Sequence, residues 1–278
     1  MNRLDRRLRA LAADGRKALV PFVTAGDPSP GATVPVLHAL VAAGADILEL
    51  GVPFSDPMAD GPVIQRSSER ALARGIGTAQ VFAAVREFRR HDADTPVVLM
   101  GYLNPVEMRG PADYAAAAVD AGVDGVLLVD LPPEEAAPFR AAFGPHGLAL
   151  ISLAAPTTSD ERLARLAAEA QGYVYYVSLA GVTGAALGDG GDIAARTAAL
   201  RAQSPVPVMI GFGIKDAASA AAMGRLADGV VVGSALVDRL AAAGEDADAA
   251  ARAAGEFLAP LRAALDGLAA GSTPHAVR

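Results

Sequence analysis

Residues 48–62 of the chain read Leu48-Glu49-Leu50-Gly51-Val52-Pro53-Phe54-Ser55-Asp56-Pro57-Met58-Ala59-Asp60-Gly61-Pro62. Glu49 interrupts an apolar, strand-like run, and it shares a face with Ile47 because alternate side chains of a strand point the same way. A carboxylate in such a strand is costly unless it has a partner or a chemical task. The loop that follows carries Asp56 and Asp60 and is shaped by prolines. The stretch therefore predicts a short strand that presents a buried acid to a partly rigid acidic loop.

Short apolar runs alternate with Ala-rich amphipathic segments along the whole chain. This alternation is typical of a parallel sheet with both faces covered by helices. Eight such units in about 250 residues favour a (β/α)8 TIM barrel of the α/β class. A doubly wound open sheet is the rival, since the alternation alone does not separate the two. The expected strands are residues 18–24, 46–51, 97–101, 125–130, 148–153, 173–178, 206–211 and 229–233.

Extra helices are expected at residues 4–13, before the first strand, and at 63–72 and 78–90, after the second. Thr78 has the side chain of an N-cap for the last of these helices. No interdomain linker is evident. We expect one barrel domain over residues 1–268 and a disordered tail over residues 269–278.

Composition excludes several classes of protein. Hydrophobic residues make up 52% of the 278-residue chain, but no apolar run is long enough to span a bilayer, and the charged N-terminus lacks the apolar core of a signal peptide. With no cysteine, neither a disulfide nor a thiolate metal site is possible, so we expect a cytoplasmic protein. The net charge of −7 and the lack of a basic stripe argue against nucleic acid binding. The four histidines show no metal-ligand spacing, and no metal is expected.

Candidate catalytic groups lie where barrel enzymes place them, at the C-terminal ends of the strands. Glu49 ends the second strand among apolar neighbours that would raise its pKa, and Asp60, on a solvated loop, would stay ionised and accept a substrate hydrogen bond. Two carboxylates around one cavity suit proton transfer. Other interpretations remain: Glu49 pairs with a barrel cation, or Asp60 only forms an Asp-Gly turn. For Asp130, which ends the expected fourth strand, we favour a turn anchor.

Glycines cluster after the last three strands, at residues 181–184, 211–213 and 233–234. Barrels often bind phosphate after strands seven and eight, and Ser234 would open a helix whose free N–H groups attract an anion. Residues 184–191 are rich in glycine and aspartate, which is typical of a mobile lid.

The run from Leu48 to Gln65, with residues 21–28 and the three glycine clusters, resembles the tryptophan synthase alpha subunit family over roughly residues 1–265. The resemblance implies a TIM-barrel lyase of tryptophan biosynthesis that cleaves indole-3-glycerol phosphate to indole and glyceraldehyde 3-phosphate by a retro-aldol reaction. It implies that Glu49 and Asp60 are the catalytic pair.

The resemblance also implies the binding residues and the partner. Substrate contacts are expected from Phe22, Met100, Leu127, Tyr175, Thr183 and Phe212, and phosphate contacts from Gly184, Gly213, Gly233 and Ser234. This subunit needs no cofactor; pyridoxal phosphate belongs to a beta subunit, the partner in an α2β2 heterotetramer. The partner interface is expected at Pro53, Asp56, Pro57, Asn104 and Pro105. Leu179 stands where some members carry an arginine, so closure of the lid is expected to differ.

Three alternatives stay open. A stand-alone lyase that releases free indole would use the same pair, although the 53–57 loop and the Asn104-Pro105 dipeptide favour the subunit. A catalytically inactive scaffold for a beta subunit is disfavoured by the intact Glu49 and Asp60. Another phosphosugar isomerase or epimerase would want a lysine, a histidine or a metal at the strand ends, where none is expected.

Overall fold

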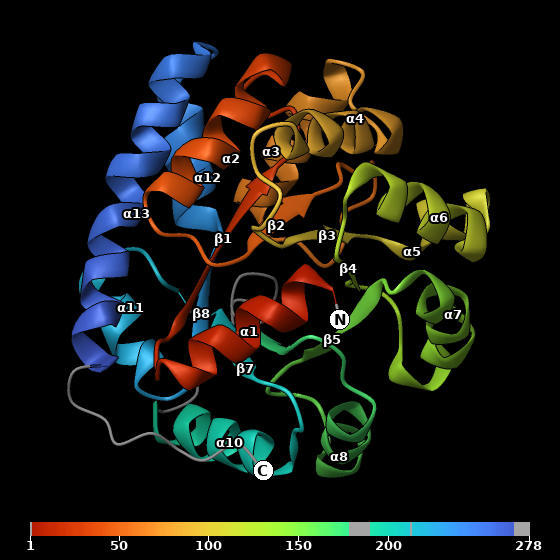
Figure 1. Cartoon of the computed structure of the whole chain (residues 1–278), viewed down its shortest axis with the longest axis vertical. Coiled ribbons are helices and arrows are strands. Elements are labelled where there is room, and N and C mark those ends of the chain that lie inside the picture. Colours follow the sequence, from red (N-terminus) through yellow and green to blue (C-terminus); the bar gives the residue numbers. More distant parts are fainter. Residues whose placement is uncertain (1, 178–189, 212, 270–278) are drawn as a thin grey trace.

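The computed structural model describes residues 2–177, 190–211 and 213–269. Eight parallel strands form a closed barrel in the order of the sequence (Figure 1). The closed barrel confirms the (β/α)8 prediction and excludes the open sheet. The strands are β1 (Ala18–Thr24), β2 (Leu48–Gly51), β3 (Val97–Gly101), β4 (Gly125–Leu128), β5 (Ala149–Ala154), β6 (Val174–Val177), β7 (Val208–Gly211) and β8 (Gly229–Val232).

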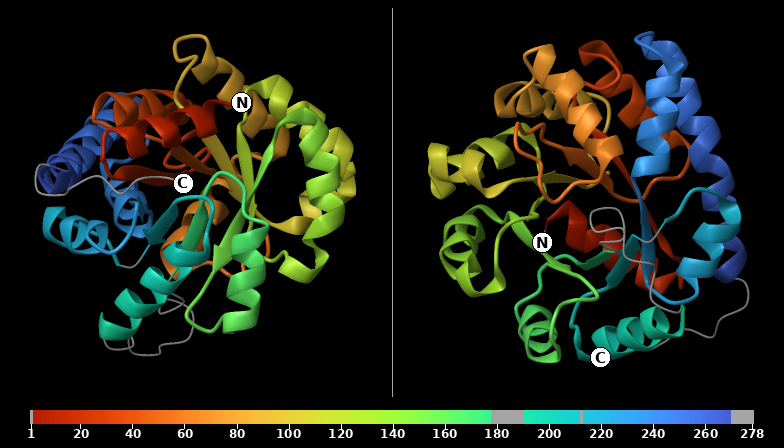
Figure 2. Two further views of the ribbon diagram at one scale, coloured as in Figure 1. Left: turned by 60° about the horizontal axis from the view of Figure 1, so that its bottom comes forward. Right: turned by 180° about the vertical axis from the view of Figure 1, so that it is seen from behind.

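Helices surround the barrel on all sides (Figure 2). In chain order they are α1 (Arg3–Ala13), α2 (Thr33–Ala42), α3 (Pro62–Ala73), α4 (Thr78–Arg89), α5 (Leu103–Arg109), α6 (Pro111–Ala121), α7 (Ala136–Phe143), α8 (Asp160–Ala168), α10 (Gly190–Gln203), α11 (Ala217–Gly224), α12 (Ser234–Ala243) and α13 (Ala247–Ala269). Short 3-10 turns are η1 (Pro30–Ala32), η2 (Pro133–Glu135) and η3 (Gly144–His146). The extra helices expected before β1 and after β2 are confirmed as α1, α3 and α4.

Two local predictions were wrong. Thr78 is not an N-cap: Gly77 holds that position in an extended conformation, and its N–H donates to the Gln80 side chain at 3.1 Å. A glycine takes this place easily, and the reciprocal bond from Gln80 replaces a hydroxyl cap. The expected strand 125–130 is too long, because β4 ends at Leu128 and Asp130 lies in the turn that follows.

Helix α1 closes the barrel at the end where its strands begin. Its buried face, Leu4, Leu8 and Leu11, packs against side chains inside the barrel. Burying each leucine contributes about 2 kcal/mol. The helix is drawn in red across the barrel in Figure 1. The interior side chains that it meets belong to one cluster that includes Ala18, Val20, Ile47, Val98, Leu127, Ala149, Ile151, Tyr173, Tyr175, Met209 and Val231.

A second hydrophobic layer lies between the strands and the outer helices. Outward-facing residues of the strands, such as Leu48 and Leu50, belong to this layer. Helices α2 and α13 pack side by side in it, which joins the N-terminal and C-terminal parts of the chain (Figure 1). Because Leu48 and Leu50 point outward, Glu49 between them points into the interior of the barrel.

A polar pattern recurs four times where the strands begin. A side-chain oxygen just before each even-numbered strand accepts the backbone N–H at the start of the preceding odd-numbered strand. The four pairs are Asp46 with Leu19 at 2.9 Å, Asp124 with Val97 at 3.0 Å, Gln171 with Leu150 at 2.9 Å and Asp228 with Val208 at 3.0 Å. These four hydrogen bonds fix neighbouring strands relative to one another and so contribute to stability. Catalysis in such barrels takes place at the opposite ends of the strands.

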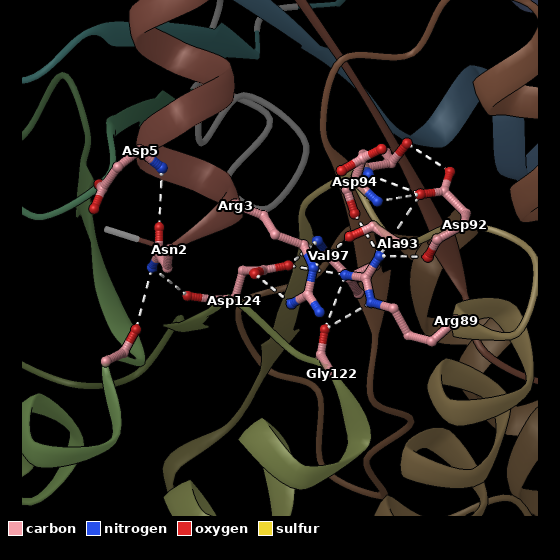
Figure 3. A network of polar contacts seen from close by, with 12 residues as sticks. Asn2, Arg3, Asp5, Arg89, Asp92, Ala93, Asp94, Val97, Gly122 and Asp124 are labelled. Carbon is pink, nitrogen blue, oxygen red and sulfur yellow. Dashed lines mark hydrogen bonds and ion pairs between the residues drawn. The ribbon is translucent and has the colours of Figure 1, made fainter.

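Arginines compensate the buried carboxylates of this pattern. Asp124 is 2% exposed and binds Arg3 at 3.0 Å and Arg89 at 2.9 Å, as Figure 3 shows. Asp46 is fully buried and binds Arg16 at 2.8 Å and Arg262 at 2.9 Å. A buried carboxylate is tolerated because several donors satisfy its oxygens at once.

Candidate active site

Glu49 lies inside the barrel, beside Phe22 on β1 and Val98 on β3. Its side chain is fully buried. The Tyr173 hydroxyl donates a hydrogen bond to Oε1, and Oε2 has no hydrogen-bond partner in the described part of the chain. No described arginine or lysine forms an ion pair with Glu49, so the geometry does not support the interpretation that it serves only as a structural ion-pair partner.

Burial gives Glu49 the acidity of a proton-transfer group. Loss of water raises its pKa from 4.5 to about 7, and the hydrogen bond from Tyr173 acts in the opposite direction. At neutral pH the protonated and ionised forms are therefore both populated. A side chain in this state can give a proton in one step and take one in the next.

Asp60 is buried as well, and the expectation of a solvated loop was wrong. It is 9% exposed because the loop after β2 folds back over the barrel. Burial raises its pKa to about 6, while the Tyr102 hydroxyl, which donates to Oδ2 at 3.0 Å, lowers it. The carboxylate does not cap α3, whose N-cap is Gly61. Asp60 therefore stays mostly ionised at neutral pH. Its pKa is set by burial and by the hydrogen bond from Tyr102, and not by exposure to solvent.

A small hollow at the C-terminal ends of β1 to β4 contains Asp60. Met100 and Phe22 line it together with Tyr102. The full lining is Phe22, Thr24, Gly51, Val52, Asp60, Ile64, Ser68, Met100, Gly101, Tyr102 and Val129. Leu127 is fully buried deeper in the barrel, in the cluster that holds Tyr173 and Tyr175.

Tyr175 is buried inside the barrel and senses both carboxylates. Burial raises its pKa, and the negative charges of Glu49 and Asp60 raise it further. It packs on Gly211, where an added Cβ would lie 2.2 Å from the phenol oxygen. Asp60 lines the small hollow, whereas Glu49 and Tyr175 do not belong to its lining and are buried in the barrel.

Phe22 forms part of the floor of this space. A Cβ added at Gly51 would lie 2.7 Å from the Phe22 ring, so only glycine fits beneath the ring on β2. On the other side, the Cβ position of Gly233 lies 3.6 Å from Phe22. The aromatic ring therefore spans from the second strand to the loop after the eighth.

The rim after β7 and β8 has the properties of an anion site. Ser234 is the first residue of α12 and Gly233 its N-cap, and no side chain of the described residues caps the N–H groups there. Gly213 has a φ of +56° and open space around its Cβ position. Helix N-termini of this kind bind phosphate through the backbone. Leu179, Thr183, Gly184 and Phe212 lie outside the described residues. So do residues 184–189 of the lid expected at 184–191, while its last two residues begin α10.

The residues expected at a partner interface differ in exposure. Asp56 and Asn104 are exposed, Pro57 and Pro105 are partly exposed, and Pro53 is buried in this chain. Sequence reasoning missed two neighbours in the same segments: Met58 is 74% exposed and Met108, on α5, is 80% exposed.

Comparisons with known proteins agree over nearly the whole chain. A family model of tryptophan synthase alpha chains matches residues 8–265. The chain belongs to the tryptophan synthase alpha chain family. It is 67% identical to the tryptophan synthase alpha chain of Xanthomonas euvesicatoria pv. vesicatoria and 65% identical to that of Xylella fastidiosa strain 9a5c, each covering 96% of this chain and 99% of the relative. The solved tryptophan synthase subunit alpha of Legionella pneumophila str. Paris has a TM-score of 0.89 at 48% identity, with 96% of this chain and 99% of that chain covered.

Membership of the tryptophan synthase alpha chain family confirms the function class that the resemblance implied. The chain is a carbon–carbon lyase of tryptophan biosynthesis that cleaves indole-3-glycerol phosphate to indole and glyceraldehyde 3-phosphate. The role of an alpha subunit is supported, and a free-standing lyase is not favoured. In the described ranges, no helix is both long and apolar enough to cross a membrane.

Two tyrosines hydrogen-bond the carboxylates: Tyr173 was not singled out from the sequence, and Tyr102 was noted only as a residue that follows the third strand. Tyr173 lies two positions before Tyr175, so the alternation of a strand places both inside the barrel. Tyr102 directly follows β3, and that position was its only signal. Asp130, for which a turn anchor was expected, accepts a hydrogen bond from the Leu103 N–H at 2.8 Å, which ties the turn after β4 to the start of α5.

Proposed function

We propose that Glu49 and Asp60 form the catalytic pair of the lyase reaction. One observation carries the proposal: Glu49 is fully buried, one of its oxygens is bound by Tyr173, and the other has no partner in the described residues. A buried polar atom without a partner is costly, and such groups often serve a reaction. Asp60 is the second buried acid with a raised pKa inside or at the C-terminal end of the barrel.

Protonation begins the reaction. Glu49 in its acid form donates its proton to C3 of the indole ring, which leaves a positive charge on the ring nitrogen. Ionised Asp60 accepts a hydrogen bond from that N–H and stabilises the charge. The low exposure of Asp60 strengthens this interaction, because little water screens it.

Cleavage follows when Glu49 acts as the base. Its carboxylate takes the proton of the hydroxyl on the carbon attached to C3, and that oxygen forms the aldehyde carbonyl. The bond between the two carbons breaks, and its electron pair returns to the ring and neutralises the nitrogen. One proton has been added to C3 and one removed from the hydroxyl, so Glu49 ends in its acid form. The pKa of about 7 suits both transfers.

Substrate placement follows from the same site. We propose that Phe22, Met100, Leu127 and Tyr175 line an apolar slot for the indole ring, with Thr183 and Phe212 completing it. The phosphate would bind backbone N–H groups at Gly213, Gly233 and Ser234, with Gly184 opposite. The uncapped N-terminus of α12 supports this placement.

The partner is a beta subunit in an α2β2 complex, which holds the pyridoxal phosphate, while this chain needs no cofactor. We place the interface at the exposed segments around Asp56 and Asn104, to which Met58 and Met108 add apolar surface. The 53–57 loop is continuous with Asp60, so binding there can reach the catalytic site. We also propose a cytoplasmic location and a single domain over residues 1–268.

The test is indole formation from indole-3-glycerol phosphate by the purified chain, with and without a beta subunit. We expect slow cleavage alone, strong acceleration by the partner, and both rates strongly lowered, to a residual level that can still be measured, in Asp60→Asn. Asp56→Asn should keep the slow rate and weaken the acceleration. Cleavage by Asp60→Asn at the wild-type rate would show that Asp60 is not part of the catalytic pair. A cleavage rate that does not change when a beta subunit is added would contradict the proposed complex.

A further inference from the structure

Tyr102 makes an unusual set of contacts at the end of β3. It is 4% exposed and lines the hollow that contains Asp60. Its hydroxyl accepts the Ala59 N–H at 3.0 Å and donates to Asp60 Oδ2 at 3.0 Å. Its ring stacks on Phe54, with 4.8 Å between the ring centroids and 24° between the planes. One side chain thus touches the β2–α3 loop at its start and at its end.

The remaining hydrogen bonds of this loop are local. The Met58 N–H donates to Asp56 at 2.8 Å, and the Asp60 N–H donates to Pro57 at 3.0 Å. Gln65, in the first turns of α3, donates to the Asp60 carbonyl at 2.8 Å. Gln65 also donates to the Pro57 carbonyl at 3.3 Å. In the described part of the chain, the hydrogen bonds that tie residues 53–60 to other elements come from Gln65 on α3 and from Tyr102 after β3. Tyr102 is thus the contact that fixes the loop to the β3 side of the barrel.

We propose that Tyr102 is the positioning residue for Asp60, and that it transmits the position of the exposed 54–59 segment to this acid. The inference rests on the proposed role of Asp60. By binding Oδ2, the hydroxyl fixes the carboxylate and leaves Oδ1 for the ring N–H of the substrate. By stacking on Phe54, the ring ties the same carboxylate to the segment that carries the exposed Met58. A partner that shifts this segment would thereby reorient Asp60.

The pKa of Asp60 gives a second quantity by which the proposal can be tested. The described groups that interact with it are Tyr102, which donates to it, and Tyr175, whose pKa its charge raises; Asp130 acts on Tyr102 from the turn after β4. Burial raises the pKa of Asp60 to about 6, and the bond from Tyr102 lowers it. Removing the hydroxyl therefore raises this pKa, and the pH below which Asp60 is protonated moves upward.

The experiment compares Tyr102→Phe, Asp60→Asn and the double variant, each assayed for indole formation across pH with and without a beta subunit. A hydrogen bond to a charged group predicts that Tyr102→Phe lowers kcat about tenfold, with a smaller effect on KM. The acid limb of its pH profile should move up by about one pH unit. In the Asp60→Asn background the same substitution should cost nothing further.

Tyr114→Phe is the matched control, since Tyr114 is 2% exposed in the outer layer, between Phe82 and Phe143, and far from the carboxylates in the fold. It should keep the rate and the pH profile. If Tyr102→Phe does not fold, Phe54→Leu removes the stacking alone and should lower kcat only when Asp60 is present.

Two results would overturn the inference. An unchanged rate and acid limb in Tyr102→Phe would show that the phenol does not position Asp60. If Tyr102→Phe lowers kcat equally in the wild type and in the Asp60→Asn background, Tyr102 acts by stabilising the fold and not through Asp60. A fully active Asp60→Asn variant would be a different failure, that of the proposed function itself.

Discussion

Replacing Glu49 with glutamine should remove the activity and stabilise the fold at the same time. The amide keeps an acceptor for the Tyr173 hydroxyl and nearly the same volume, so the packing inside the barrel changes little. The variant cannot give or take the proton that the cleavage needs. Proton transfer by a positioned side chain contributes about 100- to 10,000-fold, so kcat should fall by at least about 100-fold.

The gain in stability follows from the pKa of Glu49. Its pKa rises from 4.5 to about 7 in the folded chain, so the folded state holds this proton more tightly than the unfolded state. Stability is therefore lost as the pH rises from about 4.5 through about 7. At about 1.4 kcal/mol for each pKa unit, ionisation costs the wild-type fold about 3 kcal/mol above pH 7. Glutamine carries no charge and escapes this cost, which corresponds to roughly 5–10 °C in Tm.

Thermal melts of both proteins at pH 5, 7 and 8 test this, beside an assay of indole formation. The difference in Tm between variant and wild type should be small at pH 5 and largest at pH 8. Glu256→Gln, at an exposed position of α13, is the control and should show no pH-dependent difference. A variant that keeps more than about a tenth of the rate, or a Tm difference independent of pH, would refute the reasoning.

Two other perturbations separate the site from its scaffold. Tyr173→Phe removes a hydrogen bond that lowers the pKa of Glu49, so the part of the kcat–pH profile that reports Glu49 should move to higher pH; an unmoved profile would contradict the contact. Asp124→Asn leaves Arg3 and Arg89 without their buried partner and should lower the free energy of unfolding by about 3–5 kcal/mol, measured by urea denaturation. The folded fraction of Asp124→Asn should keep its kcat, because the network lies where the strands begin; a large fall in kcat at low urea would show that the two ends of the barrel are coupled.

Much of the fold could be predicted because its signals are periodic. The eight apolar runs are separated by helix-compatible segments, and a barrel is the common way to bury all of them. Glu49 was placed inside the barrel by the same periodicity, and the outward packing of Leu48 and Leu50 agrees. The alternation of a strand is a local property, so the neighbours in the sequence suffice to read it.

What failed depends on contacts between distant residues. Asp60 was expected in solvent because prolines and acids are typical of exposed loops, yet this loop is held against the barrel by Tyr102. Tyr173 meets Glu49 across the barrel, a pairing that only the closure of eight strands creates. The cap of α4 failed for a local reason, since the side chain of Gln80 took the role expected of Thr78.

Helix α1 makes the barrel a cup rather than a tube. Its three leucines fill the end of the barrel where the strands begin. The ion pairs of Arg3 with Asp124 and of Arg16 with Asp46 lie around them. A small apolar molecule formed near Glu49 therefore cannot leave through the end of the barrel that α1 covers. It has to leave by the rim or between the loops that form its wall, next to the exposed methionines. In the described part of the chain, the open end of the barrel is therefore also the end that carries the segment proposed to bind a second protein.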